Sequence, residues 1–361
     1  MGEERRRSPG QEARRASSTA SARSMRWGGM GEERRRSPPF RTSRWGCSKR
    51  KTARTMLRFI FARLLQSLVA LAIISVVVFA LARATGDPLY LILPMSASQE
   101  DFDNARRYLG LDRPYVEQYL SFVGRAVTGD FGNSLRARRP VSDLIRERLP
   151  NSLKLAVFAM GVSLAMAFPL GVMAAVRKGT GLDRFAQVVS VLGQSLPTFW
   201  VAILLVEFVA GRLQWLPAGG IQGFTSYILP GFTLGWFVVA GLMRLLRSGM
   251  LEVLDSEYVK LARVKGVGEG RVIWLHALKN ALIPVITFAG IYFAILVTTA
   301  IVVETVFAWP GLGRLAYEGI SSRDFPVIQA VVLTTAAIVA VINLCVDCLY
   351  ALIDPRIRYA R

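Results

Sequence analysis

The chain has 361 residues, of which 52% are hydrophobic and only 19% are charged. Soluble domains are usually about 45–50% apolar and about 25% charged, and runs of about twenty apolar residues recur here, which excludes an ordinary soluble protein. Lys and Arg outnumber Asp and Glu by 45 to 25, but more than half of this excess lies in residues 1–55. The charge therefore does not indicate a nucleic-acid-binding protein.

Residues 1–55 hold 16 basic and 5 acidic residues and are rich in Arg, Ser, Gly and Pro. A segment with so few large apolar residues cannot bury a core, so we expect a disordered basic extension. It lacks the order of a signal peptide, and residues 1–9 recur at 30–38. Such a tail can bind anionic lipid headgroups. We favour a mis-assigned start instead, because Met56 opens an apolar stretch suited to the beginning of a membrane protein.

Six apolar stretches predict an all-α integral membrane protein within residues 56–361. Each holds about 20–24 residues, or about 30–36 Å of helix, which is enough to cross the hydrocarbon layer. Pro169 and Pro197 fall inside the second and third stretches, where kinks are tolerated if neighbouring helices satisfy the freed carbonyls. The expected spans are 59–82, 153–176, 188–211, 227–246, 282–303 and 330–352.

Six spans place both termini on one side of the membrane, and the distribution of basic residues indicates that this side is the cytoplasm. The loops that would be cytoplasmic hold 3, 7 and 3 Lys and Arg, whereas the two short outer loops hold only Arg212, Arg314 and Arg323. Segment 84–150 is then an extracytoplasmic insertion, with helices expected at 101–109 and 113–127. It is too short for an enzyme domain, so we expect a docking surface.

The chain carries no recognisable catalytic machinery. No glycine-rich loop ends in Gly-Lys-Ser/Thr, so the chain is not expected to hydrolyse ATP by itself. Its one histidine, His276, excludes a zinc motif of the H-E-x-x-H type. Cys345 and Cys348 form a single C-x-x-C inside an apolar stretch, which favours packing over a metal or redox site. We therefore expect neither a catalytic nor a metal site.

Two ionisable residues, Glu207 and Asp347, lie inside expected spans. A charge at the centre of a membrane helix costs about 2.5–3.5 kcal/mol on insertion scales and usually marks function. Both residues lie towards the end of their spans, where water is within reach. The sequence thus leaves open whether either side chain contacts a substrate.

Segment 247–281 is too polar to span the membrane and too long for a simple turn. Asp255 and Ser256 are typical N-cap residues, and Gly266 is typical of the position after a helix, so a helix of about nine residues is expected between them. Such a helix can act as a rigid lever between two spans, or it can lie on the lipid surface. The residues alone do not decide between these two roles. Tyr258, Leu261 and Ala262 are expected on one side, with Lys260, Arg263 and Lys265 around it.

Several longer motifs are spread over about 300 residues, from Met56 to Tyr359. They are Arg63-Leu-Leu-Gln-Ser67, Gly86-Asp87-Pro88, Leu192-Gly-Gln-Ser-Leu-Pro-Thr-Phe-Trp200, Trp215-Leu-Pro217, Glu257-Tyr-Val-Lys-Leu-Ala-Arg-Val-Lys-Gly266, His276-Ala-Leu-Lys-Asn-Ala-Leu-Ile-Pro284, Glu304-Thr-Val-Phe-Ala-Trp-Pro-Gly-Leu-Gly-Arg-Leu315 and Asp354-Pro-Arg-Ile-Arg-Tyr359. Together these motifs resemble the permease subunits of binding-protein-dependent ABC transporters, in the dipeptide/oligopeptide/nickel branch. The general pattern of this family has Glu-Ala at Lys260 and Leu261, Ile at His276 and Pro at Lys279, so the side chains that touch an ATPase stay open.

The resemblance implies a type I ABC importer permease fold in a bacterial cell membrane. It implies a homologous second permease, ATPase subunits that bind ATP and Mg²⁺, and an extracytoplasmic substrate-binding protein, with no cofactor on this chain. Segment 247–281 would be the coupling loop. The implied residues are Glu257, Tyr258, Lys260, Ala262, Arg263, Lys265 and Gly266 for coupling; Gln194, Ser195, Pro197 and Glu207 for the pathway; and Trp309, Pro310 and Gly311 facing the binding protein.

Di- or oligopeptides are the expected substrates, although nickel complexes and opines are carried by permeases of the same branch. The alternative is an ion-gradient-driven secondary transporter or a channel. That class usually needs coupling charges near the middle of the membrane and often has inverted repeats. Such charges are scarce in the expected spans, and no repeat is evident among them.

Overall fold

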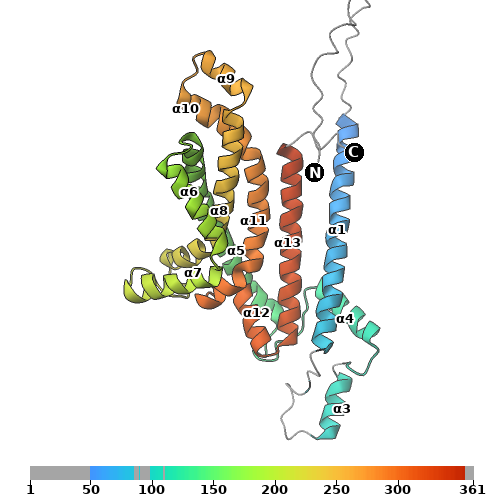
Figure 1. Ribbon diagram of the computed structural model, residues 1–361. Coiled ribbons are helices and arrows are strands. Elements are labelled where there is room, and N and C mark those ends of the chain that lie inside the picture. The colour runs from blue at the N-terminus through green and yellow to red at the C-terminus, as the bar shows by residue number, and fades with distance from the viewer. Residues whose placement is uncertain (1–48, 85–88, 90–97, 109, 354–361) are drawn as a thin grey trace, which may run out of the picture. The chain divides into compact units, whose positions relative to one another are not determined.

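The computed structural model describes residues 49–84, 89, 98–108 and 110–353 (Figure 1). Most of the expected extension 1–55 lies outside these residues, as do the family motifs at 86–88 and 354–359. The described residues form helices joined by turns and short loops. In chain order these are α1 (Lys49–Ala84), α3 (Gln99–Tyr108), α4 (Tyr115–Val127), α5 (Val141–Val176), α6 (Gly181–Ser195), α7 (Thr198–Leu205), η1 (Val206–Arg212), η2 (Phe224–Tyr227), α8 (Ile228–Leu254), α9 (Glu257–Val264), α10 (Glu269–Arg271), η3 (Val272–Ala277), α11 (Leu278–Val306), α12 (Leu312–Ser321) and α13 (Phe325–Ile353).

Among the described residues, 5 helical segments are long and apolar enough to cross a membrane, and a bent pair can supply a sixth span. This arrangement agrees with the all-α membrane fold expected from the apolar stretches. The five segments are Ile60–Ala84, Val141–Val176, Phe224–Leu254, Glu269–Val306 and Phe325–Leu349.

The third expected span, 188–211, is not one straight helix. α6 ends at Ser195, and the helix formed by α7 and η1 leaves it at an angle of 104° (Figure 1). Pro197 causes this break, because it lacks an N–H and disfavours helical backbone at the preceding residue. Leu196 accordingly has φ −80° and ψ 127°, and Pro197 stands at the start of α7. The sequence indicated a kink at this proline but not a turn through a right angle.

The second expected span, 153–176, is the last part of a longer helix. α5 begins at Val141, directly after Pro140, so its first turns lie within the expected insertion 84–150. Val141, Leu144 and Ile145 are buried against α12 and α13, and this packing keeps the chain helical well before the apolar stretch begins. α8 likewise continues to Leu254, beyond the expected end of the fourth span and into segment 247–281.

α8 lies at the centre of the packing, with α5, α6 and α11 against it. Gly235 lets α5 approach closely, because a Cβ added there would lie 2.6 Å from the Ser163 hydroxyl oxygen and 2.9 Å from the Ala159 carbonyl oxygen. The Ser163 hydroxyl donates to the carbonyl oxygens of Ala159 and Gly235, at 2.7 and 3.1 Å. α5 and α8 are therefore held almost backbone to backbone.

α1 packs along α13 at the edge of this bundle. An ion pair between Arg63 Nε and Asp347 Oδ2, 3.1 Å apart, joins the two helices, so Asp347 has a structural partner within the chain. α4 lies against α1 through a 2.8 Å hydrogen bond between the hydroxyls of Ser75 and Tyr119 and through the ring of Phe79, which meets the Tyr119 ring edge-on. The expected insertion thus includes a helix that is anchored on the first span.

Candidate functional site

The strongest candidate site is the helical unit that connects α8 to α11, residues 255–280, here called the α9 module. α9 runs from Glu257 to Val264, where the capping residues place it. Gly266 has φ +79°, a left-handed conformation that glycine adopts without steric cost. The N–H of Val267 donates to the carbonyl of Ala262, and the N–H of Gly266 donates to the carbonyl of Arg263, at 3.2 and 2.9 Å. This pair of bonds is a Schellman motif, which ends the helix sharply.

The start of α9 is less tightly capped than the sequence indicates. Ser256 occupies the N-cap position, but its hydroxyl donates to the Val253 carbonyl in the last turn of α8 and makes no bond to α9. Only one residue, Asp255, lies between the end of α8 and this N-cap. α9 is therefore joined to α8 by a turn that is itself hydrogen-bonded to α8.

Side-chain contacts fix α9 against the rest of the α9 module. The side chain of Val259, on one face of α9, is fully buried. Asn280 Nδ2 donates to the Tyr258 hydroxyl oxygen at 2.7 Å, and this hydroxyl donates to the His276 carbonyl oxygen at 3.4 Å. At the other end, Arg263 donates two hydrogen bonds to Glu269, at 2.6 and 3.1 Å. A bidentate pair of this kind fixes orientation as well as distance.

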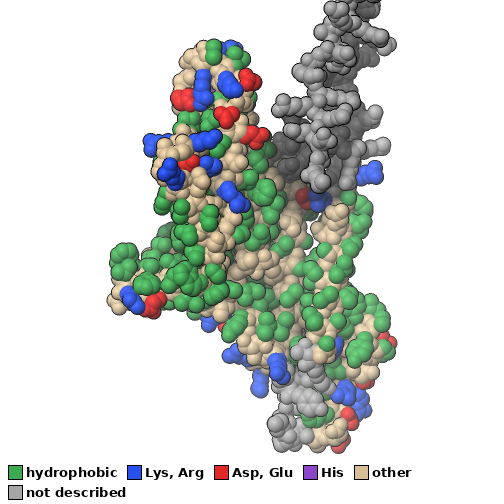
Figure 2. Space-filling model, in the orientation of Figure 1, with side chains coloured by type: hydrophobic (Ala, Val, Ile, Leu, Met, Phe, Trp, Pro, Cys, Tyr) green, Lys and Arg blue, Asp and Glu red, His purple; other side chains and the backbone are tan. Residues whose placement is uncertain are grey.

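The opposite face of α9 has no partner within the described residues and mixes apolar with basic side chains. Leu261 and Val264 are 54% and 83% exposed, and Trp274 and Leu275 of η3 are also exposed. Lys260 lies on the same helix, and the carboxylate of Glu257, 2.8 Å away, raises the pKa of its amine, so this cation stays protonated. Charged side chains gather over α9 and α10 in Figure 2, whereas the flanks of the long helices are mainly apolar. A surface of this composition can accept a protein partner with a complementary groove.

The structure shows which side of α9 is buried. Tyr258, Leu261 and Ala262 were expected on one side of the helix, without a statement of which side is buried, and the structure buries Val259 and exposes Tyr258 and Leu261. Asn280 and Glu269 belong to the site and were missed by the sequence analysis. They lie beyond the end of α9, and only the fold of η3 and α10 brings them back to it.

The residues expected in a translocation pathway lie in two places. Gln194, Ser195 and Pro197 sit together at the break between α6 and α7, with Gln194 half-buried and the other two exposed. Glu207 lies in η1, beyond the far end of α7, where it pairs with Arg212 at 3.1 Å. Both of these side chains are more than half exposed. The described structure thus brings together three of the four pathway residues.

Trp309 and Gly311 were expected to face a binding protein, and both are buried within the described residues. The Trp309 side chain is 0% exposed. Its indole N–H donates to the Asn151 carbonyl at 3.1 Å, while Asn151 Nδ2 donates to the Pro310 carbonyl at 2.9 Å. A Cβ added at Gly311 would lie 2.4 Å from the carboxylate of Glu304. The Trp-Pro-Gly segment between α11 and α12 is therefore hydrogen-bonded to α5 at Asn151, and of its three residues only Pro310 is partly exposed.

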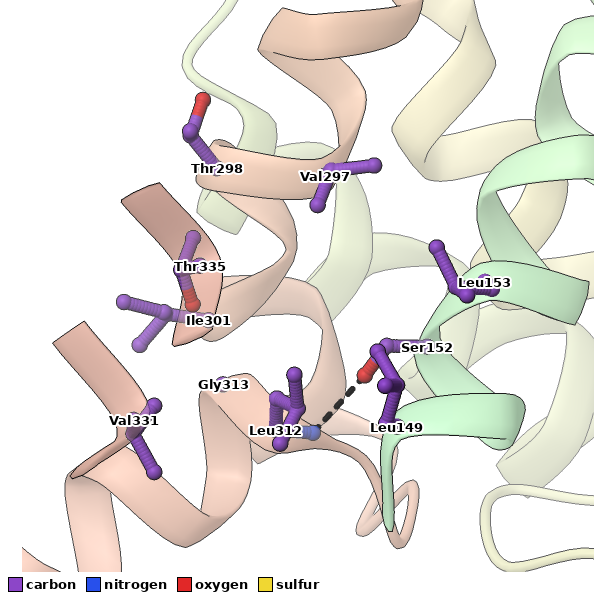
Figure 3. A pocket seen from close by; sticks show the side chains of 10 residues that line it. All are labelled: Leu149, Ser152, Leu153, Val297, Thr298, Ile301, Leu312, Gly313, Val331 and Thr335. Carbon is purple, nitrogen blue, oxygen red and sulfur yellow. Dashed lines mark hydrogen bonds between the residues drawn. The ribbon is translucent and has the colours of Figure 1, made fainter. Parts of the chain in front are cut away.

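Glu304 holds this junction together from inside. Its carboxylate accepts hydrogen bonds from the Ser152 hydroxyl at 2.6 Å and from the Arg314 N–H at 3.1 Å. Ser152 in turn accepts from the Leu312 N–H at 2.7 Å, the dashed bond in Figure 3. Three helices, α5, α11 and α12, meet through this one carboxylate.

A cavity of about 30 Å³ lies beside the junction, lined by Ser152, Thr298 and Thr335 together with apolar side chains (Figure 3). It has room for about one water molecule, so it cannot take a peptide. A more open hollow of about 440 Å³ lies between α5 and η2, lined by Phe158, Phe224 and Lys154 among others.

Two family models match most of the chain. Residues 56–156 match the model described as Binding-prot-dependent transport system membrane comp, N-term. Residues 167–359 match the model described as Binding-protein-dependent transport system inner membrane component. The second match includes the break at Pro197 and the whole α9 module.

Two relatives extend the likeness over nearly the whole permease region. The chain is 41% identical over 305 residues to the glutathione transport system permease protein GsiC of Escherichia coli K12, covering 84% of this chain and 100% of the relative. It is 39% identical over 316 residues to the oligopeptide transport system permease protein AppB of Bacillus subtilis 168, with the same coverage. An inward-facing structure of the MetNI methionine ABC transporter is similar in fold, with a TM-score of 0.50, 18% identity, and coverage of 58% of this chain and 96% of that chain.

Proposed function

Because the chain belongs to the family of binding-protein-dependent transport system inner membrane components, we propose that it imports di- or oligopeptides as the permease subunit of an ATP-driven ABC transporter. Two relatives of 41% and 39% identity, named as glutathione and oligopeptide permeases, support a peptide substrate. The fold is that of a type I importer permease. ATP hydrolysis belongs to a separate subunit of such a system, so this chain is not itself an enzyme.

The chain works with partners in this proposal. A homologous second permease completes the pathway, ATPase subunits bind ATP and Mg²⁺, and an extracytoplasmic binding protein delivers the peptide. The family places the chain in the inner membrane. The basic residues around α9 support a cytoplasmic position for the α9 module and for both termini, because positively charged loops favour that side.

The structure of the α9 module is the observation that best supports a coupling role. α9 ends in the Schellman motif at Gly266 and is hydrogen-bonded to α8 through Ser256 and to α11 through Tyr258 and Asn280, so we expect it to move together with the ends of α8 and α11. In this proposal its exposed Leu261 and Val264, flanked by Lys260 and Lys265, are the surface that meets a groove on an ATPase. Closure of the ATPases on ATP would displace α9 and, with it, the attached spans.

The pathway forms between this chain and the second permease. The cavity beside the Glu304 junction has about 30 Å³ and the open hollow between α5 and η2 about 440 Å³, and in this proposal the second permease supplies the rest of the route. We assign Gln194 and Ser195, at the break between α6 and α7, to its lining, because an interrupted helix leaves carbonyl groups available to a polar substrate.

Reconstitution in vesicles tests this function. The complex purified through a tag on this chain is expected to contain a second permease and P-loop ATPases, and to take up labelled peptide only when ATP and the binding protein are both present. Uptake driven by a proton gradient without ATP would instead support a secondary transporter.

A further inference from the structure

A buried ion pair fixes the beginning of α6 to α8. Arg247 Nε and one amino group of its guanidinium donate to the two carboxylate oxygens of Asp183, at 2.6 and 3.0 Å. The Asp183 side chain is 3% exposed and that of Arg247 is 23% exposed. Asp183 also accepts a hydrogen bond from the Gly179 N–H at 2.9 Å, so its carboxylate holds the turn between α5 and α6 as well.

Two further contacts hold α6 to α8 along its length. The Ser190 hydroxyl donates to the Ala240 carbonyl at 3.0 Å. One turn later, a Cβ added at Gly193 would lie 2.5 Å from the Ala240 Cβ, which means that the helices touch without an intervening side chain. α6 is therefore attached to α8 near both of its ends, and it cannot slide or roll on α8 without breaking the Asp183–Arg247 pair.

The contacts between α6 and α8 lie between the α9 module and the break that separates α6 from α7. Arg247 lies two turns before the end of α8, and α9 follows after Asp255 and Ser256. Asp183 lies in the first turn of α6, which ends at Ser195, next to the break at Leu196 and Pro197. Any displacement that α9 passes to α8 is therefore passed to α6 and reaches the break through a helix with no internal joint.

We propose that Asp183 and Arg247 are positioning residues that make α6 move as one body with α8, so that displacement of α9 reaches the pathway residues at the break between α6 and α7. This proposal rests on the proposed function, in which closure of the ATPases displaces α9. In this role the ion pair contributes to coupling, although neither Asp183 nor Arg247 touches peptide or ATPase.

Asp183→Asn is the first test, since it keeps the shape and removes the charge. In the full complex we expect ATP hydrolysis to continue while peptide transported per ATP falls about tenfold, within the range for residues that link two sites. Glu252→Gln is the matched control, because it removes one carboxylate from an exposed position of α8 and is expected to leave this ratio unchanged. The exchanged pair, Asp183→Arg with Arg247→Asp, is expected to recover part of the ratio. An unchanged ratio in Asp183→Asn would overturn the proposal.

Spin labels give a readout that does not depend on transport. Arg184 and Ser248 are exposed on α6 and α8, and both can be changed to Cys once the 3 native cysteines are replaced by Ala. With the ion pair intact, the distance between the labels should stay the same with and without trapped ATP. With Asp183→Asn, the distance distribution should broaden even without nucleotide. A distance that changes with nucleotide in the intact pair would show that α6 does not move with α8.

These two measurements separate the proposal from the function on which it rests. A wild-type complex that takes up no peptide with ATP would refute the importer function, whereas the label distances would still decide whether the ion pair holds α6 to α8. A complex that transports normally with Asp183→Asn would refute the ion pair's role alone.

Discussion

The indole N–H of Trp309 donates a hydrogen bond to the backbone carbonyl of Asn151, 3.1 Å away and 158 positions earlier in the chain. Asn151 returns a bond from its own amide to the Pro310 carbonyl. The ring of Tyr227 meets the indole edge-on, with the ring centres 4.6 Å apart. Trp309 thus holds three parts of the chain together, and its substitution should lower the stability of the protein.

Trp309→Phe keeps most of the buried aromatic surface and removes the donor. We expect the free energy of unfolding to fall by about 1 kcal/mol, the usual value of one hydrogen bond. Thermal unfolding of the purified chain in detergent measures this loss. Affinity for the binding protein should not change, and a weaker affinity with unaltered stability would mean that the indole does face a partner.

Gly266→Val should uncouple transport from ATP hydrolysis. A Cβ at this position meets nothing within 4 Å, so the effect comes from the φ of +79°, which costs an ordinary residue about 1–2 kcal/mol. Relief of this strain would undo the Schellman motif and turn the end of α9. The ratio of peptide uptake to ATP hydrolysis, with both measured on the same vesicles, should fall.

Gly268→Val is the matched control for that change. Gly268 also has open space around it, but its φ of −58° and ψ of 142° suit valine. Gly266→Asn should be milder than Gly266→Val, because asparagine tolerates the left-handed conformation. Wild-type transport in Gly266→Val would refute the role of α9 as a lever.

Tyr258 and Asn280 should act as a pair. Tyr258→Phe and Asn280→Ala each remove the 2.7 Å hydrogen bond that ties α9 to α11. If this bond holds α9 in the position that the ATPase binds, the double variant should bind the ATPase subunit no more weakly than the weaker-binding single variant, with an interaction energy of about 0.5–1.5 kcal/mol. The three variants are compared by the concentration of ATPase subunit needed for half-maximal binding. Strictly additive losses would show that the two residues act independently.

Glu304→Gln should destabilise the junction of α5, α11 and α12. The amide nitrogen of Gln cannot accept the bonds that Ser152 and Arg314 donate to the carboxylate, so at least one buried donor is left unpaired. A cost of about 1–3 kcal/mol is expected. Glu147→Gln is the control, because its partner Arg139 lies at the surface and exposed ion pairs contribute about 1 kcal/mol or less. Equal melting temperatures for the two variants would contradict the structural role of Glu304.

Local signals in the sequence predicted the helices well where the cause of the structure is itself local. Apolar stretches of membrane length mark the spans, and Ser256 and Gly266 mark α9, because capping depends on residues within the same few turns. Pro197 predicted an interruption for the same reason. Its angle of 104° could not be predicted, because it depends on how α7 packs against α8 and α11.

Contacts between distant parts of the chain left no such signal. Val141 begins α5 early because α12 and α13 cover it, and those helices come more than 150 residues later. Trp309 in a Trp-Pro-Gly loop reads like a surface aromatic, yet Asn151 and Tyr227 bury it. Asp183 and Arg247 form an ion pair although 64 positions separate them in the chain, and no sequence motif predicts that they meet.

The ion pair between Arg63 and Asp347 has a consequence for the order of assembly. It joins the first membrane helix to the last, so a ribosome must complete almost the whole chain before Arg63 can meet Asp347. Until then Arg63, near the start of the first span, has not met the carboxylate that it pairs with in the folded chain. Closing this contact is therefore a late step in the assembly of the helices, and α1 can dock along α13 only after the other spans have been made.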